Sequence, residues 1–279
     1  MLENFVKMLY NAYERKEAVG SFNFYNYETL RGILQAAHEE KVPVIASFGK
    51  KYLKNMSLEE VGALAKAAVS EEDKVCLHLD HCNDLGIIYQ AVKAGFTSVM
   101  YDGSALSYED NIKNTKKVCE VAHACGVSVE AELGSLAAGE HSHEGSSDDR
   151  EVYTNPAAAA QFVRETGVDA LAVSIGTVHG MYKGVPNIRV DILQEINEQT
   201  RIPLVLHGGS GTPEEKLRQC IYNGISKINV NTEISEYAVK NIKELLSKEQ
   251  PHLSVISLEQ TKYVSEVVKK YIRIFLGKG

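Results

Sequence analysis

The sequence lacks the features that mark several classes of protein. Its five cysteines form an odd set without a CxxC pair, which argues for reduced thiols in a cytoplasmic protein and against a disulfide framework. No apolar run approaches the roughly 20 residues needed to span a bilayer, and the amphipathic residues 1–16 do not resemble a signal peptide. A basic excess is also absent, since the net charge is −7, which disfavours nucleic acid and anionic membranes as partners.

Short apolar, β-branched runs instead alternate with longer helical patterns from end to end. Eight runs are predicted strands: Ala18–Phe24, Pro43–Phe48, Val75–Leu79, Thr97–Tyr101, Val127–Leu133, Ala170–Ile175, Pro203–Leu206 and Ser226–Val230. Seven stretches are predicted helices: Tyr27–Glu40, Leu58–Ser70, Tyr108–Cys125, Pro156–Thr166, Asp191–Gln199, Pro213–Tyr222 and Ile234–Lys248.

Strict β–α alternation implies a parallel sheet. Eight such units in this length favour a closed (β/α)8 TIM barrel, an α/β fold, as a single domain over residues 1–279. The N-terminal segment and Ile256–Leu276 are predicted as extra terminal helices, the latter on the barrel exterior or at a subunit contact. No GxGxxG motif follows the first strand, which weakens a dinucleotide-binding alternative.

One connection is unusually long and polar. Residues Gly134–Thr154 are rich in Gly, Ser, Asp and Glu and follow the fifth predicted strand. Long structureless loops in compact domains are usually functional or disordered, and this one would lie at the C-terminal rim, where barrel active sites occur. It is predicted to be a mobile active-site flap, with a solvated insertion of no role as the alternative.

Polar side chains gather where six consecutive predicted strands end. They are His78, Asp80, His81, Asp102, Glu130, Glu132, His179, His207, Asn229, Asn231 and Thr232. His81, His179 and His207 come from different strands at one rim, and three protein ligands with an open position are typical of catalytic zinc. Each alone would more often be a structural histidine, but the barrel makes the three converge.

The positions of the neighbouring carboxylates and of His78 suggest a role for each. Asp80 would lie within reach of a metal-bound substrate, as a general acid or base must. Glu132 and Asp102 could complete a second or alternate metal position or orient the histidines, and the alternative for each carboxylate is an ordinary pair with a lysine. His78 is predicted to be a core or supporting residue. Histidines on helices, in the tail and in the flap are treated as non-functional or solvated: His38, His123, His252, His141 and His143.

A phosphate site is predicted separately. In many barrels the loops after strands seven and eight bind phosphate through backbone N–H groups and a helix N-terminus. Here they contain Gly208–Pro213, with Ser210 as a hydroxyl donor, and Asn229–Glu233, with Thr232 as another. Lys183 adds a positive charge. GGSG alone could be a plain tight turn, but its position after strand seven favours a phosphate-binding loop.

These motifs resemble the class II, metal-dependent ketose-bisphosphate aldolases, which include fructose- and tagatose-bisphosphate aldolases. The matching stretches occur in the family's order: LHLDHCND, VEAELGSL with Glu140 beyond it, GTVHGMYKGVPN, VLHGGSG and KINVNTE. The resemblance spans about Phe22 to Thr232.

The resemblance implies Zn²⁺ bound by His81, His179 and His207, with Asp102 and Glu132 as alternate ligands, and a monovalent cation, Na⁺ or K⁺, in some members. It implies Asp80 as the proton donor to the aldehyde oxygen and Glu140 as the group that moves the C3 proton. Dihydroxyacetone phosphate would be bound, with Lys183 nearby, by Gly180, Gly208, Gly209, Ser210, Asn229, Val230, Asn231 and Thr232. A homodimer or homotetramer is implied by the family alone.

The reaction implied is reversible cleavage of a phosphorylated ketose, of the fructose or tagatose 1,6-bisphosphate type, into dihydroxyacetone phosphate and an aldehyde. Three departures concern the flap and the second substrate half. Ala137-Ala138 replaces the usual Gly-Gly, Gly49 replaces a common Ser or Thr, and the Asp-Pro-Arg element is missing near the C-terminus. Lys50 or Lys51 is hypothesised to hold a distal phosphate. The alternatives are a ketose-monophosphate aldolase, a metal-dependent sugar-phosphate epimerase, a hydrolase, or a sugar-binding protein without catalysis.

Overall fold

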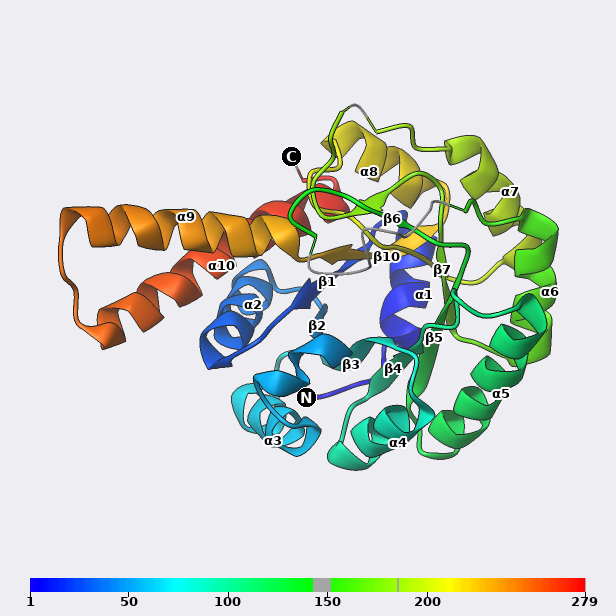
Figure 1. The fold of residues 1–279 in the computed structure, drawn as a ribbon, viewed down its shortest axis with the longest axis horizontal. Helices are drawn as coiled ribbons and strands as arrows, with labels where there is room; N and C mark the ends of the chain where they lie inside the picture. The colour runs from blue at the N-terminus through cyan, green and yellow to red at the C-terminus, as the bar shows by residue number, and fades with distance from the viewer. Residues whose placement is uncertain (143–151, 185, 279) are drawn as a thin grey trace.

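The computed structural model describes residues 1–142, 152–184 and 186–278, and its centre is a closed barrel of eight parallel strands (Figure 1). In neighbouring order the strands are β1 (Val19–Asn23), β10 (Ile225–Val230), β9 (Leu204–Leu206), β7 (Ala170–Val173), β5 (Ser128–Leu133), β4 (Ser98–Tyr101), β3 (Val75–Cys82) and β2 (Val44–Gly49), which returns to β1. The predicted TIM barrel is confirmed, and so are all eight predicted strands.

Helices surround the barrel, and Figure 1 shows them as an outer ring. They are α2 (Tyr27–Glu40), α3 (Leu58–Ala68), α4 (Leu85–Ala94), α5 (Tyr108–Ala124), α6 (Pro156–Thr166), α7 (Val190–Thr200) and α8 (Glu214–Tyr222). A 3₁₀ turn, η1 (Lys50–Lys54), follows β2. The seven helices predicted among the strands agree within two residues at each end, and the predicted C-terminal helix begins three residues late. Helix α4 was not predicted, because apolar residues occupy most of its positions and obscure the helical periodicity.

Local sequence signals set the helix ends. Asn26 and Thr29 form a reciprocal capping box at the start of α2, and Ser57 and Glu60 form another at the start of α3. Each box satisfies backbone N–H groups that the first helical turn leaves without partners. Both helices therefore begin at positions that their own side chains specify.

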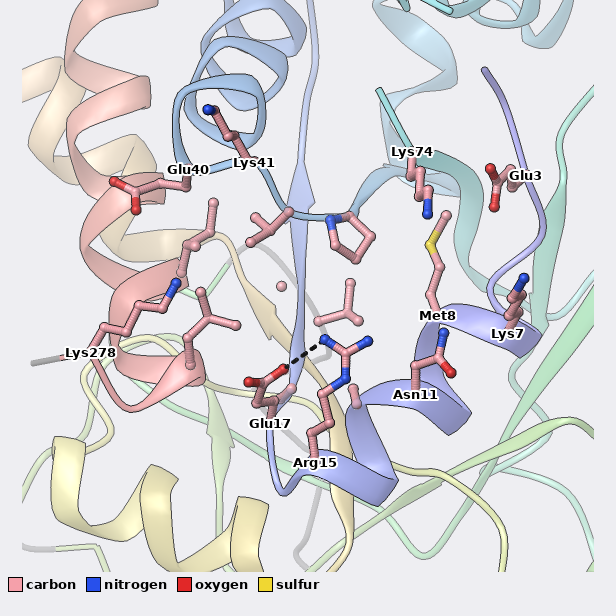
Figure 2. Close-up of a pocket in the computed structure, with 18 residues that line it drawn as sticks. Glu3, Lys7, Met8, Asn11, Arg15, Glu17, Glu40, Lys41, Lys74 and Lys278 are labelled. Carbon is pink, nitrogen blue, oxygen red and sulfur yellow. Dashed lines mark ion pairs between the residues drawn. The ribbon is translucent and has the colours of Figure 1, made fainter. Parts of the chain in front are cut away.

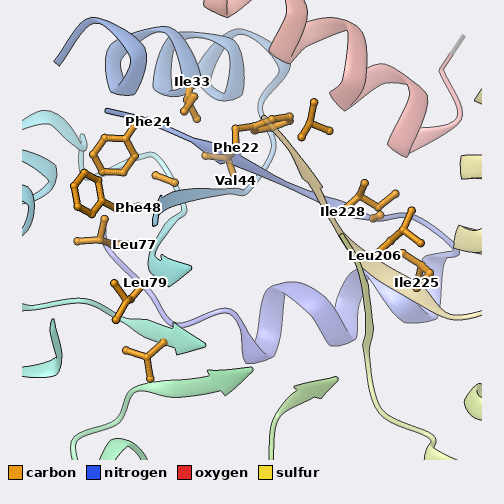
Figure 3. Close-up of a cluster of buried hydrophobic side chains, with 14 of the residues drawn as sticks. Phe22, Phe24, Ile33, Val44, Phe48, Leu77, Leu79, Leu206, Ile225 and Ile228 are labelled. Atoms are coloured by element: carbon orange, nitrogen blue, oxygen red, sulfur yellow. The ribbon is translucent and has the colours of Figure 1, made fainter. Parts of the chain in front are cut away.

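The apolar core lies mainly between the strands and the helix ring. Figure 3 shows part of it, where Phe22, Val44 and Leu77 of adjacent strands belong to one cluster with Ile33 of α2. All four side chains are fully buried. Period-two alternation sends the intervening strand residues into the barrel interior, so outward positions stabilise the fold and inward positions are available for chemistry.

Helix α1 (Val6–Arg15) closes the N-terminal end of the barrel. Phe5, Met8 and Leu9 pack against inward-facing residues such as Val19 and Ile45 in a second buried cluster. These apolar side chains fill the N-terminal end of the barrel, on the side opposite the polar strand ends.

Helices α9 (Thr232–Lys248) and α10 (Leu253–Leu276) form a hairpin that extends from the barrel (Figure 1). The second half of α10 packs on α2 and contributes Val264, Val268 and Phe275 to the core, which confirms the predicted C-terminal helix on the barrel exterior. A Cβ atom at Gly32 of α2 would lie 2.8 Å from the Val264 side chain, so glycine permits this close packing.

A cavity of about 520 Å³ lies at the N-terminal end, away from the polar strand ends (Figure 2). Arg15, Lys41 and Lys278 line it at the carboxyl ends of α1, α2 and α10. Cations in this position complement the partial negative charge of helix C-termini. Helix stabilisation therefore explains why basic residues line this cavity. Across the described ranges, no helix has the length and apolar character that membrane crossing requires.

Candidate active site

An irregularity in β3 brings two adjacent residues to the same side of the barrel wall. Strict alternation would send Asp80 inward and His81 outward. The register between β3 and β4 shifts between Leu79 and Cys82, and His81 has φ 46°, in the left-handed region. Bulges of this kind re-aim side chains near active sites, and here the bulge directs both side chains to the C-terminal mouth.

His81, His179 and His207 converge at that mouth. Their ring centroids are 4.5 Å apart for His81 and His207, 4.9 Å for His81 and His179, and 5.9 Å for His179 and His207. One nitrogen from each lies within 4.8 Å of those of the other two. His179 lies in β8 (Val178–His179), a two-residue strand outside the barrel, and the other two come from β3 and the end of β9.

A second group shares His81. Its Nδ1 lies 3.1 Å from Asp102 Oδ2 and 4.0 Å from Glu132 Oε2. Asp102 is further held by the Ser104 hydroxyl, which donates at 2.6 Å. Burial and the neighbouring Asp102 carboxylate raise the pKa of Glu132 well above its usual range. Two carboxylates this close to an imidazole form a natural alternate cation position.

Buried polar atoms directed at this mouth fit a divalent metal. His81 Nε2, His207 Nδ1 and Glu132 Oε2 are buried and have no hydrogen-bond partner among the described residues. Buried polar atoms are almost always satisfied, and imidazole nitrogens with carboxylate oxygens are donors that Zn²⁺ accepts. The donor set of the described residues therefore fits a zinc-like ion.

Glu130 and Lys227 form a buried ion pair that supports this cluster. Lys227 Nζ lies 2.8 Å from Glu130 Oε2, and both side chains are fully buried. His207 Nε2 lies 2.8 Å from Glu130 Oε1, which leaves Nδ1 for the mouth. Burial would raise the pKa of Glu130, but the Lys227 ammonium and the His207 hydrogen bond lower it to about 2. Carboxylates that orient a metal-binding imidazole are a common supporting feature.

The same lysine is linked to Asp80. Lys227 Nζ donates to Asn229 Oδ1 at 2.7 Å, and Asn229 Nδ2 donates to Asp80 Oδ1 at 3.2 Å. Asn23 Nδ2 donates to Asp80 Oδ2 at 3.0 Å. Burial would raise the pKa of Asp80, but the facing His81 and Lys227 outweigh burial and hold it below the ordinary value. Asp80 is thus an oriented carboxylate with its negative charge stabilised.

Lys227, Glu130 and Asn23 received no role in the sequence-based prediction. The signal was present: Lys227 lies within a predicted barrel strand and shares its face with Asn229. His78 is fully buried with Nδ1 2.8 Å from Ser98 Oγ and Nε2 3.7 Å from Glu130, which agrees with its predicted supporting place. His38 and His123 pair with surface aspartates, away from the site.

The two loops after β9 and β10 are adjacent. Ser210 Oγ accepts from the backbone N–H groups of Asn231 and Glu233, and Gly209 N donates to Asn229 O. Gly208 has φ 75°, and a Cβ there would lie 2.2 Å from Val178 O, so only glycine fits. Helix α9 begins at Thr232 and directs its N-terminus to these loops. Glycine loops against a helix N-terminus are typical of phosphate sites.

The predicted flap has more structure than expected. Ala137–Ala138 forms β6, which pairs with β8, and Glu140 pairs with Met181. The prediction of a loop without secondary structure is therefore wrong for these residues, because two extended segments satisfy their backbone groups by pairing. A Cβ at Gly180 would meet Glu140 O at 2.4 Å, which explains that glycine. Residues 143–151, including His143, lie outside the described residues.

Some predicted residues lie at the edge of this arrangement. The Glu140 and Lys183 side chains are exposed, and His141 pairs with Glu236 of α9. Lys50 Nζ donates to Asn83 Oδ1 at 2.6 Å, and Lys51 Nζ lies 5.3 Å from the Tyr52 ring centroid. The structure thus brings together the histidines, Asp80, Asp102 and Glu132, while the exposed residues remain around the rim.

A parallel barrel with converging histidines and an oriented carboxylate at its C-terminal mouth is the arrangement expected of a barrel enzyme. Comparison with known proteins narrows the class. The model of the class II fructose-bisphosphate aldolase family matches residues 3–279. Sulfofructosephosphate aldolase of Alkalicoccus urumqiensis is 38% identical, over 96% of this chain and 94% of its own.

Two further relatives agree. Fructose-bisphosphate aldolase of Geobacillus stearothermophilus is 41% identical, over 87% of this chain and 85% of its own. The crystal structure of the YdjI aldolase of Escherichia coli K12 superimposes with a TM-score of 0.85 at 35% identity, covering 99% of this chain and 97% of that one. The chain belongs to the class II fructose-bisphosphate aldolase family, and it is an aldolase, a carbon–carbon lyase of a family that acts on phosphorylated sugars.

Proposed function

We propose that this aldolase is zinc-dependent and reversibly cleaves a phosphorylated ketose, of the fructose or tagatose 1,6-bisphosphate type, into dihydroxyacetone phosphate and an aldehyde. The observation that carries the proposal is the convergence of His81, His179 and His207 beside Asp80. In this proposal the three histidines hold Zn²⁺, and Asp102 and Glu132, grouped with His81, form the alternate position. When bound, the ion supplies a Lewis acid for charge developing on the ketone oxygen.

Asp80 performs the proton transfer in this proposal. In the cleavage direction its carboxylate takes the proton of the C4 hydroxyl, the C3–C4 bond breaks, and the hydroxyl oxygen becomes the aldehyde oxygen. In the condensation direction it returns that proton. The amide groups of Asn23 and Asn229 hold the carboxylate in place, and its lowered pKa keeps it ionised and able to accept.

The phosphate of the dihydroxyacetone half is proposed to bind to the loops after β9 and β10. Gly208, Gly209, Ser210 and Asn229–Thr232 lie beside the N-terminus of α9. Gly180 and Lys183 lie along the neighbouring segment, which pairs with the flap. A monovalent cation, Na⁺ or K⁺, near this phosphate stays a prediction.

Glu140 is proposed to move the C3 proton of the dihydroxyacetone half. Its backbone pairs with Met181, next to Gly180, which brings the flap beside His179. Three further predictions accompany the proposal: a single domain over residues 1–279, a homodimer or homotetramer, and a cytoplasmic location. Leu253 and Leu258, exposed on the α9–α10 hairpin, would suit a subunit contact.

The first experiment measures dihydroxyacetone phosphate release from fructose 1,6-bisphosphate, tagatose 1,6-bisphosphate and fructose 1-phosphate. Each assay is run with and without EDTA and then with added Zn²⁺. Release that EDTA abolishes and Zn²⁺ restores supports zinc dependence, and the order of rates identifies the substrate. Release that survives complete metal removal would contradict the metal role, and an isomer of equal mass would indicate an epimerase.

A further inference from the structure

Glu233, in the first turn of α9, contacts the loop after β9 through its side chain. Its Oε2 accepts a hydrogen bond from the backbone N–H of Gly211 at 3.3 Å. Its own backbone N–H donates to Ser210 Oγ at 3.2 Å. Ser210 and Gly211 both belong to the loop Gly208–Pro213, for which phosphate binding is proposed above. Glu233 therefore holds two consecutive residues of this loop, and the mechanism above gives its side chain no role.

Two residues of α10 hold the Glu233 carboxylate from the other side. The Tyr271 hydroxyl donates to Oε2, and Lys270 Nζ donates to Oε1 at 2.7 Å. Burial would raise the pKa of Glu233, but the hydrogen bonds from Lys270 and Tyr271 lower it below the ordinary value, so the carboxylate stays charged at neutral pH. We call Glu233, Lys270 and Tyr271 the α10 brace. It connects the C-terminal half of α10 to the backbone of the phosphate loop.

The conformation of the loop depends on glycines, and glycines need restraint. Gly208 and Gly211 have φ angles of 75° and 70°, in the left-handed region. The turn is closed by Thr212 N, which donates to Gly209 O at 3.2 Å. Glycine has the widest backbone freedom of any residue, so contacts from outside the loop are what keep it in one conformation. Donors that are already held in place avoid the entropy cost of ordering them when a ligand binds.

The charges of the brace also matter for an anion at this position. The N-terminus of α9 attracts a phosphate, whereas a carboxylate in the same helical turn would repel it. The Lys270 ammonium offsets the charge of Glu233. Glu233 can therefore hold the Gly211 N–H while the net charge beside the phosphate loop stays close to zero.

We propose that the α10 brace positions the phosphate loop and thereby strengthens binding of the phosphorylated half of the substrate. The inference rests on the proposed function, in which this loop binds the phosphate of dihydroxyacetone phosphate. The three residues act through Gly211 and through their charges, so they are positioning residues. Their effect is expected on substrate binding, while proton transfer by Asp80 continues at its normal rate.

The test measures the Kd of dihydroxyacetone phosphate by isothermal titration calorimetry with the zinc-loaded protein. Glu233→Ala should raise this Kd about tenfold, the value of one hydrogen bond to a charged group. Glu233→Gln keeps an acceptor oxygen for Gly211 and should stay within about threefold of the wild type. Lys270→Met should raise the Kd about two- to fivefold. The control is Lys269→Met, on the same helix, because Lys269 pairs instead with Glu39 of α2 at 2.8 Å.

Steady-state kinetics separate positioning from a general loss of structure. With the ketose that the wild type cleaves fastest, Glu233→Ala should raise KM about tenfold and change kcat by less than about twofold. A variant that is merely less folded would instead show a lower kcat with unchanged KM and Kd, because the remaining folded molecules bind normally.

Three outcomes would overturn the role of the brace: an unchanged Kd in Glu233→Ala, an equal rise in Lys269→Met, or a loss in Glu233→Gln as large as in Glu233→Ala. Tyr271→Phe removes only a hydroxyl and gives the same test if the alanine variant does not fold, with an expected rise in Kd of about two- to fivefold. A zinc-loaded wild type that does not bind dihydroxyacetone phosphate would instead overturn the proposed function.

Discussion

The buried pair of Lys227 and Glu130 yields the sharpest prediction. Lys227→Met removes an ammonium that lies 2.8 Å from the carboxylate in a place without solvent access. Removing one partner of a buried ion pair costs about 3–5 kcal/mol, since the remaining charge is uncompensated. A Glu130 pKa of about 2 against an ordinary 4.5 corresponds to about 3 kcal/mol at ~1.4 kcal/mol per pH unit, which agrees in size.

The assay is urea unfolding of the metal-free protein in EDTA at pH 7, so that zinc binding adds nothing to the free energy of unfolding. Lys227→Met should lose about 3–5 kcal/mol. The double variant Lys227→Met with Glu130→Gln carries neither charge and should lose markedly less. Lys116→Met, an exposed lysine on α5, should change stability by less than about 0.5 kcal/mol. A loss below about 1 kcal/mol in the single variant would refute the reasoning.

The pH dependence follows with a definite sign. Because folding lowers the pKa of Glu130, its contribution to stability is fully present above pH 4.5, the unfolded value, and is lost as the pH falls through about 2. Wild-type protein should therefore lose about 3 kcal/mol more than the double variant between pH 5 and pH 2. Parallel stability curves for the two proteins would contradict this assignment.

Three further predictions concern the site and the hairpin. Asp80→Asn should lower kcat for cleavage by about 10²–10⁴ while zinc content, measured by atomic absorption, stays near one ion per chain. His207→Ala should lose zinc as well as activity, and retained zinc would remove it from the ligand set. Gly32→Ala should lower the free energy of unfolding by about 1–3 kcal/mol through overpacking against Val264, and an unchanged midpoint in urea would show that the helices separate freely.

Much of the fold could be predicted because the signals are local. Each strand is an apolar, β-branched run, and Asn26 and Ser57 mark helix starts with their own side chains. The order of eight alternating units then leaves few topologies besides a closed parallel barrel. The same logic placed His81, His179 and His207 at one rim, because carboxyl ends of parallel strands meet there. Helix α4 was missed because most of its residues are apolar, so its sequence shows no helical periodicity.

What only the tertiary structure decided depends on contacts between residues far apart in sequence. The bulge that turns His81 inward beside Asp80 arises from the pairing of β3 with β4, and no local signal encodes it. The joining of Glu130 to Lys227 needs strands 97 positions apart to face across the barrel interior. Local propensity acts over a few residues and therefore determined where strands and helices begin. Burial acts through space, and it determined which polar groups pair inside the barrel and which converge at its mouth.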